Sequence, residues 1–281
     1  MVERRPFLTI LSHLVLLGGV VLVMFPVYIA LVGASHPVDN LLGRIPAWFG
    51  GQMLQNFATV LGQGMEAAQT TPVGMMMLNS LVMALGITVG KITISLLAAF
   101  AVVYFRFPLR PLCFWLIFIT LMLPVEVRIL PTFRVVAELG MLNSYVGLTL
   151  PLIASATATF LFRQFFLTIP DELMEAARID GAGPMRFFWD VVLPLSRTNI
   201  AAMFVILFIY GWNQYLWPLI VTTDQDMYTV VMGIQRMVTA TDWVPDWNLI
   251  MATAILALLP PVIVVIAMQR LFIKGLVETE K

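Results

Sequence analysis

The stretch EAARIDGAGPMRFFWDVVLP, residues 175–194, separates two long apolar runs in a chain that is otherwise almost entirely apolar. The 281 residues are 60% hydrophobic and 11% charged, with a mean hydropathy of +0.93. A soluble domain carries about 25% charged residues. The composition therefore predicts a polytopic, all-α membrane protein in which this polar stretch is a connection between spans.

The residues around this stretch predict two short helices joined by a tight turn. Asp171 is a good N-cap residue, and Glu172 suits the positive end of the helix dipole. Gly181 is the residue type expected where a helix ends with a positive φ. Pro184 then suits the first turn of a second helix, which ends near Pro194. Such a pair is either an amphipathic connector on the membrane surface or a knob that docks a partner.

Six apolar segments are long enough to cross a hydrocarbon core about 30 Å thick at about 1.5 Å per residue. We expect six transmembrane helices in a single domain, residues 1–281. We also expect Pro124 to kink the third helix and Pro260-Pro261 to kink the sixth. The segments are about 10–34, 78–105, 111–130, 146–167, 198–220 and 249–273.

The basic residues predict how the chain is oriented. The first apolar run continues to about Ala34, beyond the roughly 7–15 residues of a secretory signal, so we interpret it as a spanning helix. A cytoplasmic N-terminus places eleven of the 16 basic residues inside and four outside, and leaves Lys91 in mid-membrane. Both termini and the loop 170–197 are then cytoplasmic.

Three segments are then expected outside: 35–77, 131–145 and 221–248. Residues 131–145 have the pattern of a short amphipathic helix on the membrane surface. Trp243 and Trp247 suit an interfacial belt, and so do Trp212, Tyr215 and Trp217.

The polar stretch also carries a family signature. The string EAA-x-x-D-G-A, followed by L-P, resembles the EAA signature of binding-protein-dependent ABC importer permeases. The resemblance implies a type I importer permease fold, in which this loop is the coupling helix that fits a groove on a cytoplasmic ATPase subunit. The residues that it assigns to coupling are Glu175, Ala176, Ala177, Arg178, Asp180, Gly181 and Ala182, and Leu193 and Pro194 complete the match.

Other segments extend the resemblance over the whole chain. They are similar to the maltose-type, carbohydrate-uptake branch of the family, and within it to second permease subunits of sn-glycerol-3-phosphate importers. The first outer loop, 35–77, matches less well, and we assign it no role. The matching segments are 105–110, 119–130, 147–166, 209–219 and 269–276.

The resemblance implies partners and a location that the residues alone do not give. These are a homologous second permease subunit, two cytoplasmic ATPase subunits that bind ATP and Mg, and an extracytoplasmic solute-binding protein. The expected location is the bacterial inner membrane. A neutral sugar or polyol remains an alternative substrate to sn-glycerol-3-phosphate or a related glycerophosphodiester.

Lys91 lies about midway along the second apolar segment, where a charge is costly and usually has a partner or a task. Ala84, Thr88, Lys91 and Ser95 fall on one helical stripe, which we expect to face the bundle interior. Gly86 and Gly90 form a small-xxx-small pair that permits close helix packing.

Six polar residues in or near the apolar segments are candidates for a substrate path, and each could instead have a structural role. Lys91 and Arg128 either form structural pairs, with Glu126 or a partner subunit, or give a positive potential to an anionic substrate. The amides of Asn79, Asn213 and Gln214 either contact a hydroxylated solute or bond neighbouring helices.

The sequence gives no support for catalysis by this chain. GITVGK, 86–91, has too few residues between its glycines for a phosphate-binding loop, and no Walker motif is present. His13, His36 and the single Cys113 do not form a metal or catalytic site. An ion-driven transporter is a further alternative, but such proteins often show inverted repeats, which are not seen here. An intramembrane enzyme needs clustered titratable groups, but Glu126 is the only acid near a span. We therefore expect a non-catalytic permease subunit that binds no cofactor.

Overall fold

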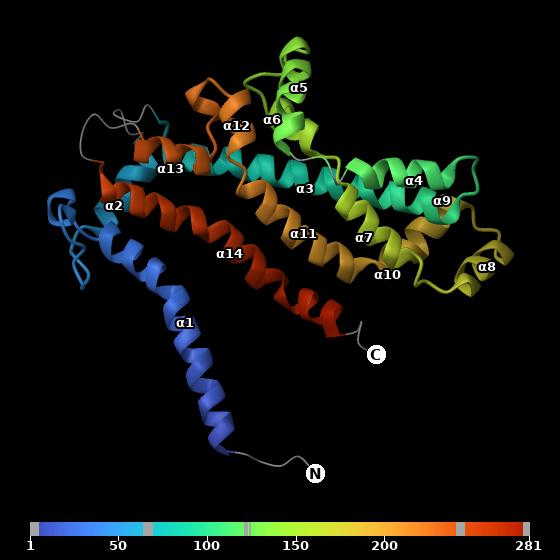
Figure 1. Cartoon of the computed structure of the whole chain (residues 1–281), viewed down its shortest axis with the longest axis horizontal. Coiled ribbons are helices and arrows are strands. Elements are labelled where there is room, and N and C mark those ends of the chain that lie inside the picture. The colour runs from blue at the N-terminus through green and yellow to red at the C-terminus, as the bar shows by residue number, and fades with distance from the viewer. Residues whose placement is uncertain (1–5, 64–69, 121–122, 124, 240–244, 278–281) are drawn as a thin grey trace. The chain divides into compact units, whose positions relative to one another are not determined.

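The computed structural model describes residues 6–63, 70–120, 123, 125–239 and 245–277, and every regular element in these ranges is a helix (Figure 1). This confirms the all-α prediction. The chain forms two compact units. One consists of Met1–Met75 and Gly233–Leu259, and the other of Met76–Met232 and Pro260–Lys281.

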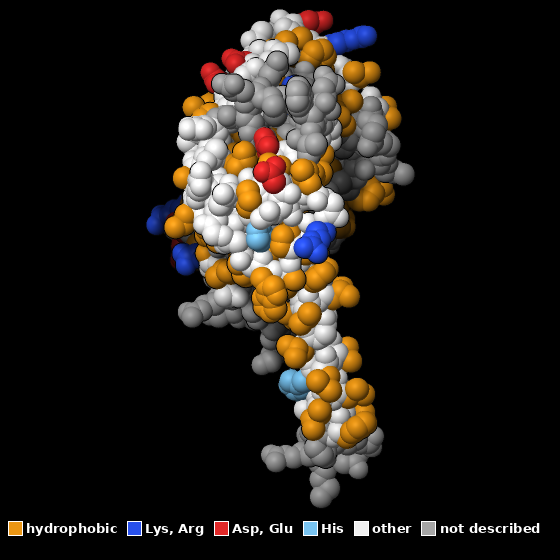
Figure 2. Space-filling model, turned by 90° about the vertical axis from the view of Figure 1, so that its left-hand side faces the viewer, with side chains coloured by type: hydrophobic (Ala, Val, Ile, Leu, Met, Phe, Trp, Pro, Cys, Tyr) orange, Lys and Arg blue, Asp and Glu red, His pale blue; other side chains and the backbone are white. Residues whose placement is uncertain are grey.

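The first unit is built on α1, Pro6–Ala34, which is apolar on all sides and mostly exposed. Figure 2 shows hydrophobic side chains along the visible face of α1. A helix that is apolar all round fits a lipid or protein surround and not water. The unit also contains η1, Val38–Leu41, and α2, Met53–Gly62.

Polar contacts fix the C-terminal end of α1 within this unit. The Asn56 amide of α2 donates to the carbonyl oxygens of Ala34 and His36, each at 2.9 Å. Asn248, near the start of α14 (Trp247–Val277), donates to Asn56 Oδ1 at 3.2 Å. A Cβ at Gly33 would overlap the Met251 sulfur, so only glycine allows α1 to approach α14 here.

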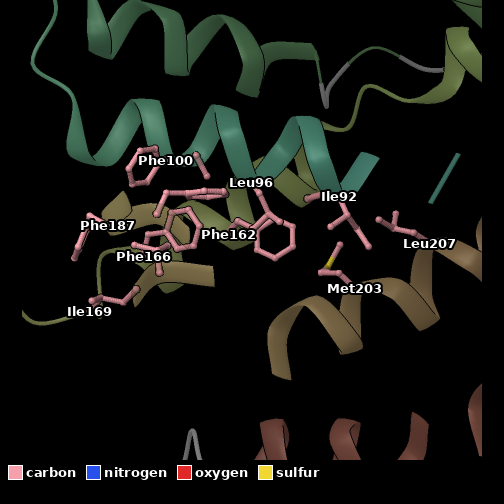
Figure 3. Packing of buried hydrophobic residues seen from close by; sticks show 13 residues of the cluster. Ile92, Leu96, Phe100, Phe162, Phe166, Ile169, Phe187, Met203 and Leu207 are labelled. Atoms are coloured by element: carbon pink, nitrogen blue, oxygen red, sulfur yellow. The ribbon is translucent and has the colours of Figure 1, made fainter. Parts of the chain in front are cut away.

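In the second unit, α3 (Val73–Tyr104) packs on α7 (Ala156–Phe166), α9 (Pro184–Phe187) and α11 (Arg197–Trp212). Figure 3 shows the buried aromatic and aliphatic side chains that these helices share. We call this the α3 cluster. Its members include Ile92, Leu96, Phe100, Phe162, Phe166, Phe187 and Met203.

Three glycines let main chains approach closely in this unit. A Cβ at Gly86 would lie 2.8 Å from Thr149 Cγ2, and one at Gly90 2.5 Å from Ile153 Cγ2. The predicted role of this glycine pair in close packing is confirmed. A Cβ at Gly211 would lie 2.9 Å from the Cα of Ala84, so α11 crosses α3 at main-chain contact distance.

Three helices of the described residues are long and apolar enough to span a membrane: Phe7–Ala34, Val73–Tyr104 and Trp247–Gln269. They correspond to the predicted spans 10–34, 78–105 and 249–273. Pro260 and Pro261 lie inside α14, which continues as a helix through both. Two bent helix pairs raise the possible number of spans to five. Six spans remain a prediction.

The third apolar segment, expected as one helix over 111–130 with a kink at Pro124, is not a single helix. The structure has α4, Arg110–Ile119, and α5, Val125–Glu138. The kink expected at Pro124 falls on a residue outside the described part of the structure. The expected surface helix over 131–145 is also wrong in its bounds, because α5 begins at Val125 and contains Pro131.

The predicted continuous helix 146–167 is also broken. It consists of α6 (Tyr145–Thr149), η4 (Leu150–Leu152) and α7, with a 49° bend. Pro151 has no N–H to donate to the Gly147 carbonyl, which instead accepts a hydrogen bond from Trp217 Nε1 at 3.1 Å. Ser155 then caps α7 by accepting from the Ala158 N–H at 3.2 Å.

The predicted helix 198–220 ends early. α11 stops at Trp212, and the short α12, Leu216–Val221, follows. Pro218 would clash with the carbonyl of residue 214, which disfavours a continuous helix through this point. The remaining short elements of this unit include η6, Gln225–Met227, and the start of α13, Val230–Thr239.

Candidate functional site

The polar stretch folds into a hairpin, residues 170–195, which we call the α8 hairpin. Its first helix, α8, runs from Asp171 to Ile179. The prediction that Asp171 is the N-cap is wrong, because Pro170 occupies that position and makes no side-chain cap bond. Asp171 and Glu172 both lie in the first turn, where their charges favour the helix dipole.

The turn after α8 has the geometry that the sequence predicts. Gly181 has a φ of +74°, and its N–H donates to the Arg178 carbonyl at 3.0 Å. The Ala182 N–H donates to the Ala177 carbonyl at 2.8 Å, which completes a Schellman motif. α9 then begins at Pro184, as predicted.

The second arm of the hairpin continues without a gap from α9. A π-helical turn, η5 (Phe188–Val192), follows it, and then α10, Leu193–Leu195. The arm meets α11 at a bend of 72°. Single π turns in helices are frequent at functional sites.

The α8 hairpin has an inner and an outer face. Met174, Ala177 and Phe187 pack in or against the α3 cluster. Glu175 and Ala176 are exposed. Arg178 is also exposed, but it lines a cavity on the inner face together with Phe100 and Phe187. Of the two small residues of the signature, only Ala176 is therefore free to approach a partner closely.

Apolar side chains of the hairpin are also exposed. Ile179 is 86% exposed at the turn, Trp189 59% and Met185 49%. Together with the exposed charges, they form a mixed surface of the kind that marks an interaction site.

A second site lies around Lys91. Ala84, Thr88 and Ser95 are fully buried and Lys91 is 7% exposed, so the predicted stripe faces the interior of the unit. The Lys91 ammonium lies 3.8 Å from the centre of the Tyr210 ring. A cation over an aromatic face is stabilised by the ring quadrupole.

Lys91 lines a cavity of about 110 Å³, together with Arg128 and Gln214. We call this the Lys91 cavity. Gln214 Nε2 donates to the Tyr210 carbonyl at 3.1 Å. Arg128 is exposed whereas Lys91 is buried, so Lys91 lies at the inner end of the cavity and Arg128 at its rim. The structure thus brings together three of the six residues predicted for the substrate path.

Asn79 lies elsewhere and is fully buried. Its amide donates to the carbonyls of Asp226 at 2.7 Å and Tyr228 at 3.0 Å, and its oxygen accepts from the Tyr145 hydroxyl at 2.7 Å. The sequence left two roles open for Asn79, contact with the solute or bonding to neighbouring segments. These bonds favour the second role.

The last two predicted path residues are Asn213 and Glu126. Asn213 is exposed at the C-cap of α11. Glu126 belongs to α5, and its side chain lies outside the described part of the structure.

Tyr210 and Thr132 line the Lys91 cavity but were not predicted as site residues. Tyr210 precedes Gln214 by four residues, and residues with that spacing on a helix lie on the same face. The spacing could therefore have identified Tyr210 as a neighbour of Gln214. The interfacial belt expected for Trp212 and Trp217 is wrong, because these side chains are only 2% and 4% exposed within the chain.

Comparison with known proteins identifies the family of the chain. Residues 91–278 match the family described as "Binding-protein-dependent transport system inner membrane component". The chain is 59% identical, over the full length of both proteins, to the sn-glycerol-3-phosphate transport system permease proteins UgpE of Yersinia pestis and of Salmonella typhi. A crystal structure of a bacterial ABC transporter involved in alginate import has the same fold, with a TM-score of 0.80 over 96% of this chain and 98% of that one, at 17% identity. The chain therefore belongs to the family of binding-protein-dependent transport system inner membrane components and is a permease subunit of an ABC importer.

Proposed function

We propose that this permease imports sn-glycerol-3-phosphate or a related glycerophosphodiester. The observation that carries the proposal is the 59% identity, over the full length of both proteins, to permeases named for sn-glycerol-3-phosphate transport. The two cationic residues of the Lys91 cavity suit such an anionic solute.

In this proposal the chain forms half of the translocation path, and a homologous permease subunit forms the other half. The bundle crosses the inner membrane six times, with both termini in the cytoplasm. The three long helices, the bent pair of α6 and α7, α11 and the α4–α5 region would supply the six crossings. An extracytoplasmic binding protein delivers the solute.

Energy enters through the α8 hairpin. Two separate ATPase subunits bind ATP and Mg, and their closure moves the hairpin, whose exposed residues include Glu175, Ala176 and Arg178. Because the inner face of the hairpin packs on the α3 cluster, its displacement is transmitted to α3 and α11. The chain itself hydrolyses no ATP.

Reconstitution into proteoliposomes tests this proposal. The complete importer, supplied with binding protein and internal ATP, should accumulate labelled sn-glycerol-3-phosphate, whereas vesicles with this chain alone should not. Accumulation of maltose or glycerol in preference to the phosphate ester would favour the neutral-solute alternative. Accumulation without ATPase subunits, driven by an ion gradient, would refute the importer mechanism.

A further inference from the structure

The Lys91 cavity has more positive charge than a structural role requires. Its lining contains the cations of Lys91 and Arg128, and among the described residues that line it no side chain is acidic. Burial of a cation is unfavourable unless it is paired or hydrogen-bonded. The Tyr210 ring offsets part of this cost for Lys91 but adds no negative charge.

The polar groups of the cavity are mostly hydrogen-bond donors. The Lys91 ammonium has three N–H donors, the Arg128 guanidinium has five, and the Gln214 amide has two, one of which bonds the Tyr210 carbonyl. The hydroxyl of Thr132 donates to the Arg128 carbonyl at 2.7 Å. A planar guanidinium beside an ammonium suits the oxygens of a phosphate group.

The size of the cavity limits what it can hold. Its volume is about 110 Å³, whereas sites that enclose whole small molecules measure about 300–1,000 Å³. At about 30 Å³ for each water, the space corresponds to three or four waters. A charged head group fits this space, and the rest of the solute would extend past Arg128 at the rim.

We propose that Lys91, Arg128 and Gln214 form a station that receives the phosphate group of the solute as it crosses the membrane, and that Tyr210 positions the Lys91 ammonium. This inference rests on the proposed function, since it requires a phosphate ester as the solute. The station gives the membrane path a charge selectivity of its own, in addition to that of the binding protein.

The test compares Lys91→Met with Arg163→Met in the complete reconstituted importer. Arg163 is a matched control, because its guanidinium also lies over an aromatic ring, that of Phe114 at 4.2 Å, but it does not line the Lys91 cavity. Uptake of labelled sn-glycerol-3-phosphate and ATP hydrolysis stimulated by the binding protein are measured on the same vesicles.

We expect Lys91→Met to slow uptake about 10- to 100-fold, the equivalent of losing one hydrogen bond to a charged group. Stimulated ATP hydrolysis should persist, so that fewer solutes cross for each ATP. Tyr210→Leu should slow uptake less than Lys91→Met, and Tyr210→Phe, which keeps the ring, should transport more than Tyr210→Leu. Arg163→Met should behave like the wild type.

Two results would overturn the station. One is uptake by Lys91→Met at the wild-type rate. The other is recovery of uptake in a Lys91→Met, Glu126→Gln double variant, because it would show that Lys91 serves only to neutralise Glu126. If Lys91→Met does not assemble, Arg128→Gln, at the exposed rim, is compared with Arg163→Met in its place. It should also slow uptake while stimulated ATP hydrolysis persists. Failure of the wild-type importer to accumulate any phosphate ester would instead refute the proposed function, so the two failures are distinguishable.

Discussion

Replacement of Gly181 by valine isolates the contribution of the turn in the α8 hairpin. Gly181 has a φ of +74°, and a Cβ added to it would meet no atom within 4 Å. The effect of the substitution is therefore one of backbone conformation and not of steric overlap. An L-residue in this region costs about 1–2 kcal/mol, and a β-branched residue is disfavoured further. The occupancy of the native turn should fall about 5- to 30-fold.

Gly183 provides the matched control for this experiment. A Cβ at Gly183 also meets no atom within 4 Å, but its φ is −72°, which any residue adopts. Gly181→Asn is a second control, because asparagine tolerates positive φ better than other residues. Gly183→Val and Gly181→Asn should therefore keep most of the activity that Gly181→Val loses.

The assay is retention of the ATPase subunits on the purified permease, followed by ATP-driven uptake. Gly181→Val should insert into the membrane normally, retain less ATPase and transport more slowly than Gly183→Val. Equal retention and equal uptake by these two variants would refute the assignment of the turn to coupling.

The remaining predictions concern a partner contact, a helix crossing and a freed carbonyl. Glu175→Lys on the exposed face of α8 should weaken ATPase retention by about 1 kcal/mol, and a pull-down with unaltered recovery would count against this contact. Gly211→Val should lower the melting temperature of the complex in detergent, since its Cβ would lie 2.9 Å from the Ala84 main chain and overpacking costs about 1–3 kcal/mol. Trp217→Phe keeps an aromatic ring but leaves the Gly147 carbonyl without its indole donor, so it should cost about 1–3 kcal/mol in thermal or denaturant stability; an unchanged midpoint would show that another donor replaces it.

The fold class and the α8 hairpin could be predicted because their signals are local. Apolar runs identify membrane helices without reference to the rest of the fold. Gly181 ends one helix and Pro184 begins the next, and each effect is confined to a few neighbouring residues. Both residues lie where expected. The stripe of Lys91 follows from helical periodicity alone, and its burial confirms that reasoning.

The helix breaks in 146–167 and 198–220 were not predicted, because a window of hydropathy does not register them. Residues 111–130 are apolar up to Pro124, and 198–220 are apolar around the break apart from Asn213 and Gln214, so the composition of each suggests one helix. Pro124 predicts the kink expected in the first of these segments, and Pro218 likewise disfavours a continuous helix in the second, because proline has no N–H to donate to the carbonyl four residues earlier. Pro151 breaks the intervening segment in the same way.

Long-range partners could not be predicted from local pattern. Asn79 bonds the Asp226 carbonyl, 147 residues away, so its structural role becomes visible only after folding. The contact between Lys91 and Tyr210 is also visible only after folding, because it depends on α11 crossing α3 next to Gly211. Whether a polar residue bonds another helix or lines the cavity depends on where the helices cross, which local sequence does not give.

The sidedness of Glu175 tests the central claim most directly. Cys113 is the chain's single cysteine, so Cys113→Ser allows Glu175→Cys to be labelled alone. In oriented vesicles, a membrane-impermeant thiol reagent should reach position 175 from the cytoplasmic side, and bound ATPase subunits should protect it. Labelling from the opposite side, or labelling that the ATPase subunits leave unchanged, would contradict the account.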